Sequence, residues 1–135
     1  MRFGFHISIA QGISAVIEKA RKMRCETIQL FSRNPRGWYY KIIPDAEVER
    51  FKTNLRKSDI SPCFLHLPYL PNLASPDKDL YAKSVDSLCA DLARADVLGI
   101  PFLVVHVGKR LGLSEGRAMA RVAAAVNRSL KKESN

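Results

Sequence analysis

Histidine is the residue type in this sequence best suited to metal chemistry, and the chain contains three: His6, His66 and His106. Each falls near the end of a short apolar stretch that is typical of a β-strand. Neighbouring strands lie about 4.8 Å apart, so His66 and His106 could hold the same ion, and imidazole nitrogen is a favoured zinc ligand. For any one of them, the alternative is a polar core residue with a hydrogen-bonded imidazole.

Two imidazoles do not complete such a site, because a catalytic zinc needs three protein ligands and an open position. No Asp or Glu stands at a predicted strand end. Asp45, Asp77 and Glu115 fall at predicted helix starts, where capping or dipole pairing explains them. We therefore expect the metal site to be incomplete within this chain, with its catalytic residues unknown.

A second informative segment, FSRNPRGWYY at residues 31–40, combines guanidinium groups with aromatic rings. Such groups contact phosphate and stack on, or wedge between, bases. A tryptophan that covers the sheet, with solvated arginines around it, is the alternative. The residues expected beside each other on the rim are Arg33, Arg36, Trp38, Tyr39 and Tyr40.

The charge balance agrees with a polyanionic partner but does not establish one. Twenty-two Lys and Arg against thirteen Asp and Glu give a formal net charge of +9, and such a field attracts polyanions. Nucleic acid is the first candidate, and a basic surface without a specific ligand is the alternative. Tyr69 and Asn72, in the segment HLPYLPN, belong to the same rim or are plain turn residues.

Cysteine usage and hydropathy predict a cytoplasmic protein. Cys25, Cys63 and Cys89 form no CxxC pair and are odd in number, so reduced, buried thiols are expected. The first twelve residues alternate polar with apolar side chains, unlike a signal peptide. No run approaches the roughly 18 apolar residues of a membrane helix.

The hydrophobic period alternates along the chain between two and three-to-four, which predicts four strand–helix pairs. Right-handed crossovers between such pairs give an α/β fold with a parallel sheet. Because no G-x-G-x-x-G follows the first strand, half of a (β/α)₈ barrel is favoured over a doubly wound dinucleotide fold. The strands are expected at residues 3–8, 27–31, 63–66 and 102–106, and the helices at 13–23, from about 45 to 55, at 80–95 before Gly99, and from Ser114 onward.

Four stretches resemble the endonuclease IV family of apurinic and apyrimidinic endonucleases, in the family's order and spacing. They are GFHISIAQG at 4–12, LFSRNPRGW at 30–38, HLPYLPNLASP at 66–76 and LGIPFLVVHVG at 98–108. Two departures are Gln11, in place of the first of a glycine pair, and Val107, where a proline often stands.

The resemblance implies a TIM barrel with three zinc ions that hydrolyses the phosphodiester 5′ to an abasic site in duplex DNA and leaves a 3′-hydroxyl. It implies that residues 1–135 are the N-terminal half of a single xylose-isomerase-like TIM barrel, with the C-terminal half missing, so that this chain is a truncated and inactive form. On that view His66 and His106 are two ligands of one zinc, and a glutamate from a fifth strand is the third. The implied DNA contacts are Arg36, Tyr69, Trp38, Asn34 and Asn72, and the residues expected to surround the metal ligands are His6 and Ser8.

Two competing hypotheses remain open at this stage. The chain is a non-catalytic DNA-binding half-barrel, or it is part of a barrel isomerase or epimerase that acts on sugars with a divalent metal. In either case, the open edges of a half-barrel sheet favour pairing with a second copy or aggregation.

Overall fold

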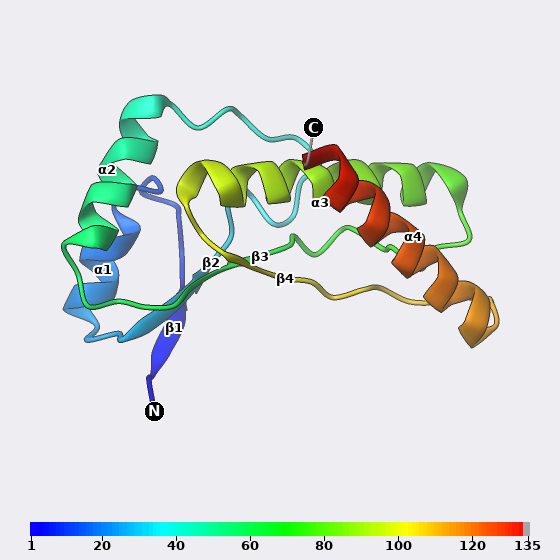
Figure 1. Ribbon diagram of the computed structural model, residues 1–135, viewed down its shortest axis with the longest axis horizontal. Coiled ribbons are helices and arrows are strands. Elements are labelled where there is room, and N and C mark those ends of the chain that lie inside the picture. Colours follow the sequence, from blue (N-terminus) through cyan, green and yellow to red (C-terminus); the bar gives the residue numbers. More distant parts are fainter. Residues whose placement is uncertain (134–135) are drawn as a thin grey trace.

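The computed structural model describes residues 1–133, which form a four-stranded parallel sheet with a helix after each strand (Figure 1). All four predicted strand–helix pairs are confirmed; β1, β2 and β4 are slightly shorter than expected, and β3 has the expected bounds. The elements are β1 Gly4–Ile7, α1 Val16–Lys22, β2 Thr27–Leu30, α2 Asp45–Arg56, β3 Cys63–His66, α3 Lys78–Leu98, β4 Phe102–Val104 and α4 Glu115–Glu133.

The strand order, β1-β2-β3-β4, contains no reversal. A doubly wound sheet changes direction at a switch point, so this order rules that architecture out in favour of the half-barrel. The register pairs His6 with Gln29, Gln29 with Phe64, and Phe64 with Phe102. Partners across parallel strands point to the same face, so these side chains share one side of the sheet.

The opposite face of the sheet carries the apolar core. Ile7, Ile28, Leu30 and Leu65 are buried there against the helices, with Phe51 of α2 completely enclosed. A second cluster lies farther along the sheet, between the β3–α3 loop, α3 and α4. The alternation of strand residues therefore separates a helix-covered face from a face with no helix over it in residues 1–133.

The two ends of α3 form as the local sequence predicts. The side chain of Asp77 accepts a hydrogen bond from the backbone N–H of Leu80 at 2.7 Å and caps the helix start. Gly99 ends the helix with φ of 67°, the left-handed conformation that glycine adopts without steric cost.

Glu47, in the first turn of α2, has a role beyond pairing with the helix dipole. Its carboxylate accepts hydrogen bonds from the backbone N–H of Ser14 at 3.1 Å and from the Ser14 hydroxyl at 2.9 Å. These two bonds lower the pKa of Glu47. A side chain of α2 thus fixes the turn that leads into α1, a contact between segments 33 residues apart.

Candidate functional site

The three histidines gather at the carboxyl ends of the strands. The ring centroids of His66 and His106 are 5.0 Å apart, and those of His66 and His6 are 6.0 Å apart. The centroid of the Phe31 ring lies 4.4 Å from that of His6 and 5.2 Å from that of His66, so Phe31 packs against both. Parallel strands bring their carboxyl ends to one edge, which is why residues so distant in sequence meet here.

His66 is held in the form that a metal ligand requires. Its Nδ1 lies 2.6 Å from the carbonyl oxygen of Leu67. A carbonyl can only accept, so Nδ1 carries the proton and the Nε2 lone pair is left for a ligand. Burial lowers the pKa of His66, the hydrogen bond to Leu67 opposes this shift, and the neighbouring His106 and His6 lower the pKa further. The net shift is downward and favours the neutral ring.

His6 and Ser8 have partners of their own within the sheet and the loop after β1. His6 Nδ1 lies 3.0 Å from the Gln29 side-chain oxygen. The Ser8 hydroxyl oxygen accepts a hydrogen bond from the backbone N–H of Ala10 at 3.3 Å. His6 therefore neighbours His66, whereas the Ser8 hydroxyl bonds within its own turn.

No group of three or more His, Cys, Asp or Glu side chains positioned to hold a metal ion occurs within residues 1–133. The donor chemistry of His66 and His106 suits zinc, since both are imidazoles and His66 is neutral. Their number falls short of the three protein ligands that a catalytic zinc needs.

Two loops stand beside the histidines and are joined to each other. The backbone N–H of Tyr69, in the β3–α3 loop, donates to the carbonyl of Pro35, in the β2–α2 loop, at 3.1 Å. The Asn34 side chain accepts from the backbone N–H of Arg36 at 3.0 Å. Arg36 is exposed, and Trp38 and Tyr69 are 36% and 63% exposed. Cationic and aromatic groups of these two loops therefore face solvent, and among them the Tyr69 ring lies 6.3 Å from that of His66.

Arg33 does not lie on that surface, and its expected place beside Arg36 on the rim is wrong. The residue is only 5% exposed, and its guanidinium forms an ion pair with Asp91 of α3 at 2.9 Å. A charged side chain enters a protein interior where a counter-charge is available, and Asp91 supplies one.

Asn72 uses its side chain to join two loops. Its Nδ2 donates to the carbonyl of Lys109 at 2.9 Å, and its Oδ1 accepts from the backbone N–H groups of Lys109 and Ala74 at 3.0 and 3.1 Å. Gly108 passes so close that an added Cβ would meet Asn72 itself. The pair fixes the β4–α4 loop just after His106, along a groove of about 700 Å³ lined by Tyr69 and His106.

Three residues that matter to this site escaped the sequence-based interpretation: Asp91, Arg94 and Glu47. A signal existed for Asp91, because it falls three residues after Leu88 and four before Ala95, on the apolar stripe of its helix. An acidic residue on a buried stripe indicates a buried cationic partner. Nothing in the sequence pointed to the contacts of Arg94 with Ser32 or of Glu47 with Ser14.

The parallel strand order, with a helix after each strand, defines the class of (β/α) barrels. The family described as "xylose isomerase-like TIM barrel" matches this sequence over residues 17–134, and the chain belongs to that family. Within it, the chain is recognised as similar to endonuclease IV. A protein of Methanosphaerula palustris named "probable endonuclease 4" is 40% identical over 133 residues, which are 96% of this chain and 46% of that protein.

Solved structures agree with the sequence comparison. Endonuclease IV from Thermus thermophilus superposes with a TM-score of 0.83 at 34% identity, over 96% of this chain and 47% of that one. A D-tagatose 3-epimerase-like protein superposes with a TM-score of 0.65 at 13% identity, over 96% of this chain and 48% of that one, which shows the fold alone. The chain spans about half the length of the relatives that it matches.

None of the helices within residues 1–133 has the length and apolar character needed to cross a membrane.

Proposed function

We propose that this chain contributes to a DNA-repair endonuclease that hydrolyses the phosphodiester 5′ to an abasic site in a zinc-dependent reaction and leaves a 3′-hydroxyl. The observation that carries the proposal is the position of the neutral His66 and its neighbour His106 beside two joined loops with exposed cationic and aromatic side chains. The names of the relatives, "probable endonuclease 4", support the same assignment.

In this proposal His66 and His106 hold zinc, which when bound supplies Lewis-acid stabilisation of the phosphoryl oxygens. The Leu67 carbonyl fixes the His66 ring by accepting a hydrogen bond from its Nδ1. His6, with Gln29 and Ser8, shapes the surface around the ligands. Residues 1–135 act as the N-terminal half of one barrel, and the remaining ligands come from the C-terminal half. The cytoplasmic location expected from the sequence stays a prediction.

The DNA contacts in this proposal come from both loops. Arg36 and Trp38 approach the duplex from the β2–α2 loop, with Asn34 fixing the backbone of Arg36. Tyr69 approaches from the β3–α3 loop, and Asn72 holds that loop against Lys109. A missing base lowers the cost of opening the stack, so side chains inserted there favour an abasic site.

The deciding experiment is strand cleavage on a denaturing gel, with one duplex containing a single abasic site and one intact duplex. The chain with zinc is tested alone and mixed with the C-terminal half of a relative. We expect little cleavage by the chain alone, and chelator-sensitive cleavage of the abasic strand by the mixture. Salt-sensitive binding without cleavage in either case would instead support a non-catalytic DNA-binding half-barrel.

We also propose self-association through the open sheet. β1 and β4 are each paired on one side only, and the exposed fractions of Phe3, Phe5 and Phe102 are 65%, 58% and 48%. Unpaired strand edges beside exposed phenylalanines favour pairing with a second copy.

Light scattering coupled to gel filtration is expected to show a mass that rises from monomer towards dimer as the protein concentration increases. Phe102, which stacks on Phe64 at 5.3 Å, is the position at which a substitution tests this surface. The variant Phe102→Ser should shift the transition to higher concentration, whereas a monomer mass at every concentration would contradict the proposal.

A further inference from the structure

A buried ion pair lies behind the β2–α2 loop, on the helix-covered side of the candidate site. Asp91 of α3 has no exposed surface, and Arg33 is 5% exposed. The Arg33 Nη2 and Nε groups donate to Asp91 Oδ2 at 2.9 and 3.2 Å. Nη2 also donates to the Ser87 hydroxyl at 2.5 Å. Nothing in this pair faces the surface where DNA is proposed to bind.

The same guanidinium holds the backbone of its own loop. Arg33 Nη1 donates to the carbonyl oxygens of Gly37 at 3.2 Å and Trp38 at 3.5 Å. The chain between Arg33 and Gly37 must therefore curve back on itself. The segment with Asn34, Pro35 and Arg36 is the crest of that curve.

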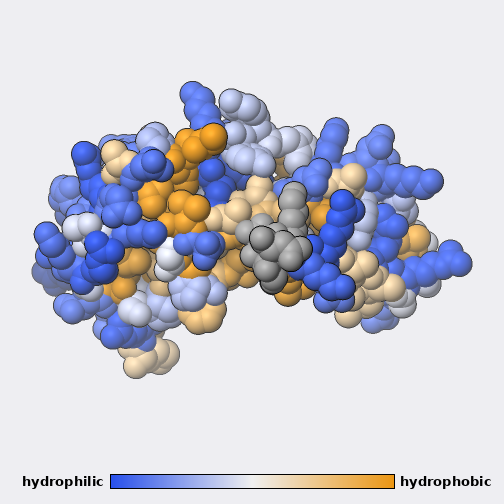
Figure 2. All heavy atoms as spheres, turned by 45° about the horizontal axis from the view of Figure 1, so that its top comes forward, coloured by the Kyte–Doolittle hydropathy of each residue, from blue (hydrophilic) through white to orange (hydrophobic). Residues whose placement is uncertain are grey.

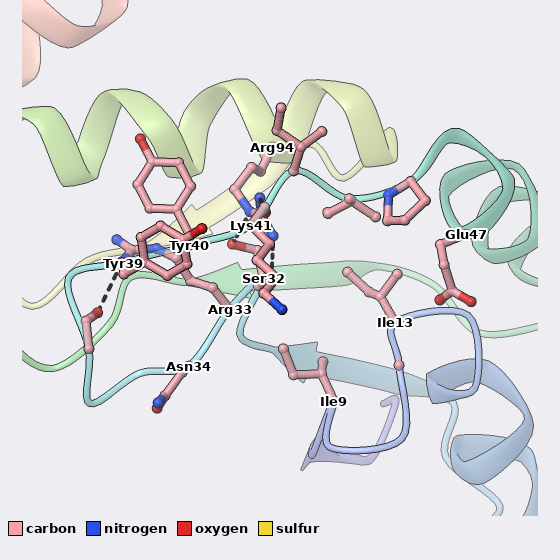
Figure 3. A pocket seen from close by; sticks show the side chains of 15 residues that line it. Ile9, Ile13, Ser32, Arg33, Asn34, Tyr39, Tyr40, Lys41, Glu47 and Arg94 are labelled. Carbon is pink, nitrogen blue, oxygen red and sulfur yellow. Dashed lines mark hydrogen bonds between the residues drawn. The ribbon is translucent and has the colours of Figure 1, made fainter.

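A second guanidinium closes the other end of the loop. Arg94 of α3 donates to the carbonyl of Ser32 at 2.6 Å and to the carbonyl of Lys41 at 2.9 Å. The Ser32 hydroxyl accepts from Arg94 Nε at 2.9 Å and donates to Asp91 at 2.6 Å, which links the two anchors. The Tyr40 ring lies within 5.0 Å of the Arg33 guanidinium carbon and 5.8 Å of that of Arg94 (Figure 3). Two arginines and one aspartate thus fix four carbonyl groups between Ser32 and Lys41.

Stability alone does not explain this arrangement. A well-packed apolar pair often replaces a buried ion pair with no loss of stability. An apolar pair cannot, however, donate to the carbonyls of Gly37 and Trp38. What the charged pair adds is therefore one defined shape of the loop.

The shape of the loop determines where the exposed groups stand. Arg36 follows directly on the turn that the Asn34 side chain closes at 3.0 Å. Pro35, on the same crest, accepts the hydrogen bond from the Tyr69 backbone at 3.1 Å. A shift of the crest would move Arg36 and release Tyr69 together.

We propose that Arg33 and Asp91 are positioning residues, which hold the β2–α2 loop so that Arg36 and Tyr69 meet the DNA in a fixed relation. The proposal deepens the proposed function and rests on it for the identity of the ligand. Neither residue touches DNA. Their effect on binding passes through the backbone of residues 34–38.

The loop carries its own reporter, because Trp38 is the one tryptophan of the chain. The double variant Arg33→Met with Asp91→Leu removes both charges and places apolar side chains in the space of the ion pair. We expect it to keep the far-UV circular dichroism and a cooperative unfolding transition, with a lower midpoint because the Ser32 hydroxyl loses its acceptor on Asp91. The carbonyls of Gly37 and Trp38 lose their hydrogen-bond donor in this variant, so the loop should become more mobile. We therefore expect the Trp38 emission to shift to the red, with stronger acrylamide quenching. Tryptic cleavage after Arg36 and Lys41 should also become faster.

The affinity for a duplex with one abasic site, measured by fluorescence anisotropy of the labelled DNA, should fall about tenfold in the double variant. Arg36→Gln is the matched control: DNA affinity falls and Trp38 emission stays as in the parent chain.

If the double variant does not fold, Arg33→Lys takes its place. Lysine keeps the counter-charge of Asp91, but its single ammonium cannot serve the carboxylate and both carbonyls at once. Arg33→Lys should therefore also shift the Trp38 emission to the red and increase its quenching by acrylamide.

A folded variant of either kind with parental Trp38 emission, proteolysis and DNA affinity would overturn the proposal. Failure of the proposed function looks different: the parent chain, alone and with the complementing half, would not bind the abasic duplex. The Trp38 and proteolysis measurements would still show whether Arg33 and Asp91 hold the loop.

Discussion

Replacing Gly4 by alanine is expected to lower the free energy of unfolding by about 3 kcal/mol, the upper part of the range for overpacking. A Cβ at Gly4 would overlap the carbonyl oxygen of Thr27 and lie 2.6 Å from its carbonyl carbon. These are backbone atoms of the neighbouring strand β2, which is paired on both sides. β1 would have to leave its register to make room. Urea denaturation followed by circular dichroism measures the change.

Gly116→Ala is the matched control for Gly4→Ala. Gly116 lies near the start of α4, and an added Cβ there meets nothing within 4 Å. Alanine in a helix is favoured over glycine, so this variant should be more stable by about 0.5–1 kcal/mol. A Gly4→Ala protein as stable as the parent chain would show that the approach of β1 to β2 is less close than described.

The second large effect is expected from the histidine pair. In the mixture with the C-terminal half of a relative, His66→Ala and His106→Ala should each reduce chelator-sensitive cleavage by more than about 100-fold, because loss of a mere supporting partner already costs roughly 10–100-fold. Each removes one of the two imidazoles that this chain contributes to the proposed zinc site. Cleavage rates at saturating zinc, read from a denaturing gel, test this.

His6→Ala is the control of the same residue type. Its ring lies 6.0 Å from that of His66 and is bonded to Gln29, so its removal should cost less than loss of either ligand. Competition with a chromogenic zinc chelator gives a second readout that does not depend on activity. Parental zinc affinity in His66→Ala would remove this residue from the proposed site.

Zinc binding should also weaken as the pH falls. His66 must be neutral to bind a metal, and burial together with His106 and His6 lowers its pKa below the usual 6.5. The unfolded chain therefore takes up a proton at His66 before the folded chain does. This residue thus makes the fold less stable as the pH drops through about 6.5 and below.

The relation between the two loops gives these expectations a common physical basis. His6 and His66 lie on strands, which the sheet fixes, and His106 lies two residues beyond β4, whereas Arg36 and Tyr69 lie on loops, which side chains must fix. Figure 2 shows hydrophilic side chains spread over much of the visible surface, with apolar side chains gathered in patches between them. The formal net charge of +9 makes positive charge available on the protein for a polyanion, but the direction in which a duplex would bind depends on how the loops are held.

The sequence by itself determined the elements whose causes are local. Asp77 and Gly99 bound α3 as predicted, because a capping carboxylate and a left-handed glycine act within one helical turn. The alternating apolar pattern predicted four strands, and parallel connections then placed His66 and His106 at one rim.

Only the tertiary structure decided which polar residues face solvent and which are buried in the interior. Arg33 and Arg36 look alike in the sequence, but Asp91, 58 residues after Arg33, draws the first of them into the interior. In the sequence Gly4 looks like an ordinary strand residue, whereas in the structure the carbonyl of Thr27 leaves no room for a Cβ at this position. The physical reason is the same in both cases. Burial and close approach depend on pairs of residues that are distant in the sequence, and a local sequence pattern does not show which distant residue will lie beside a given one.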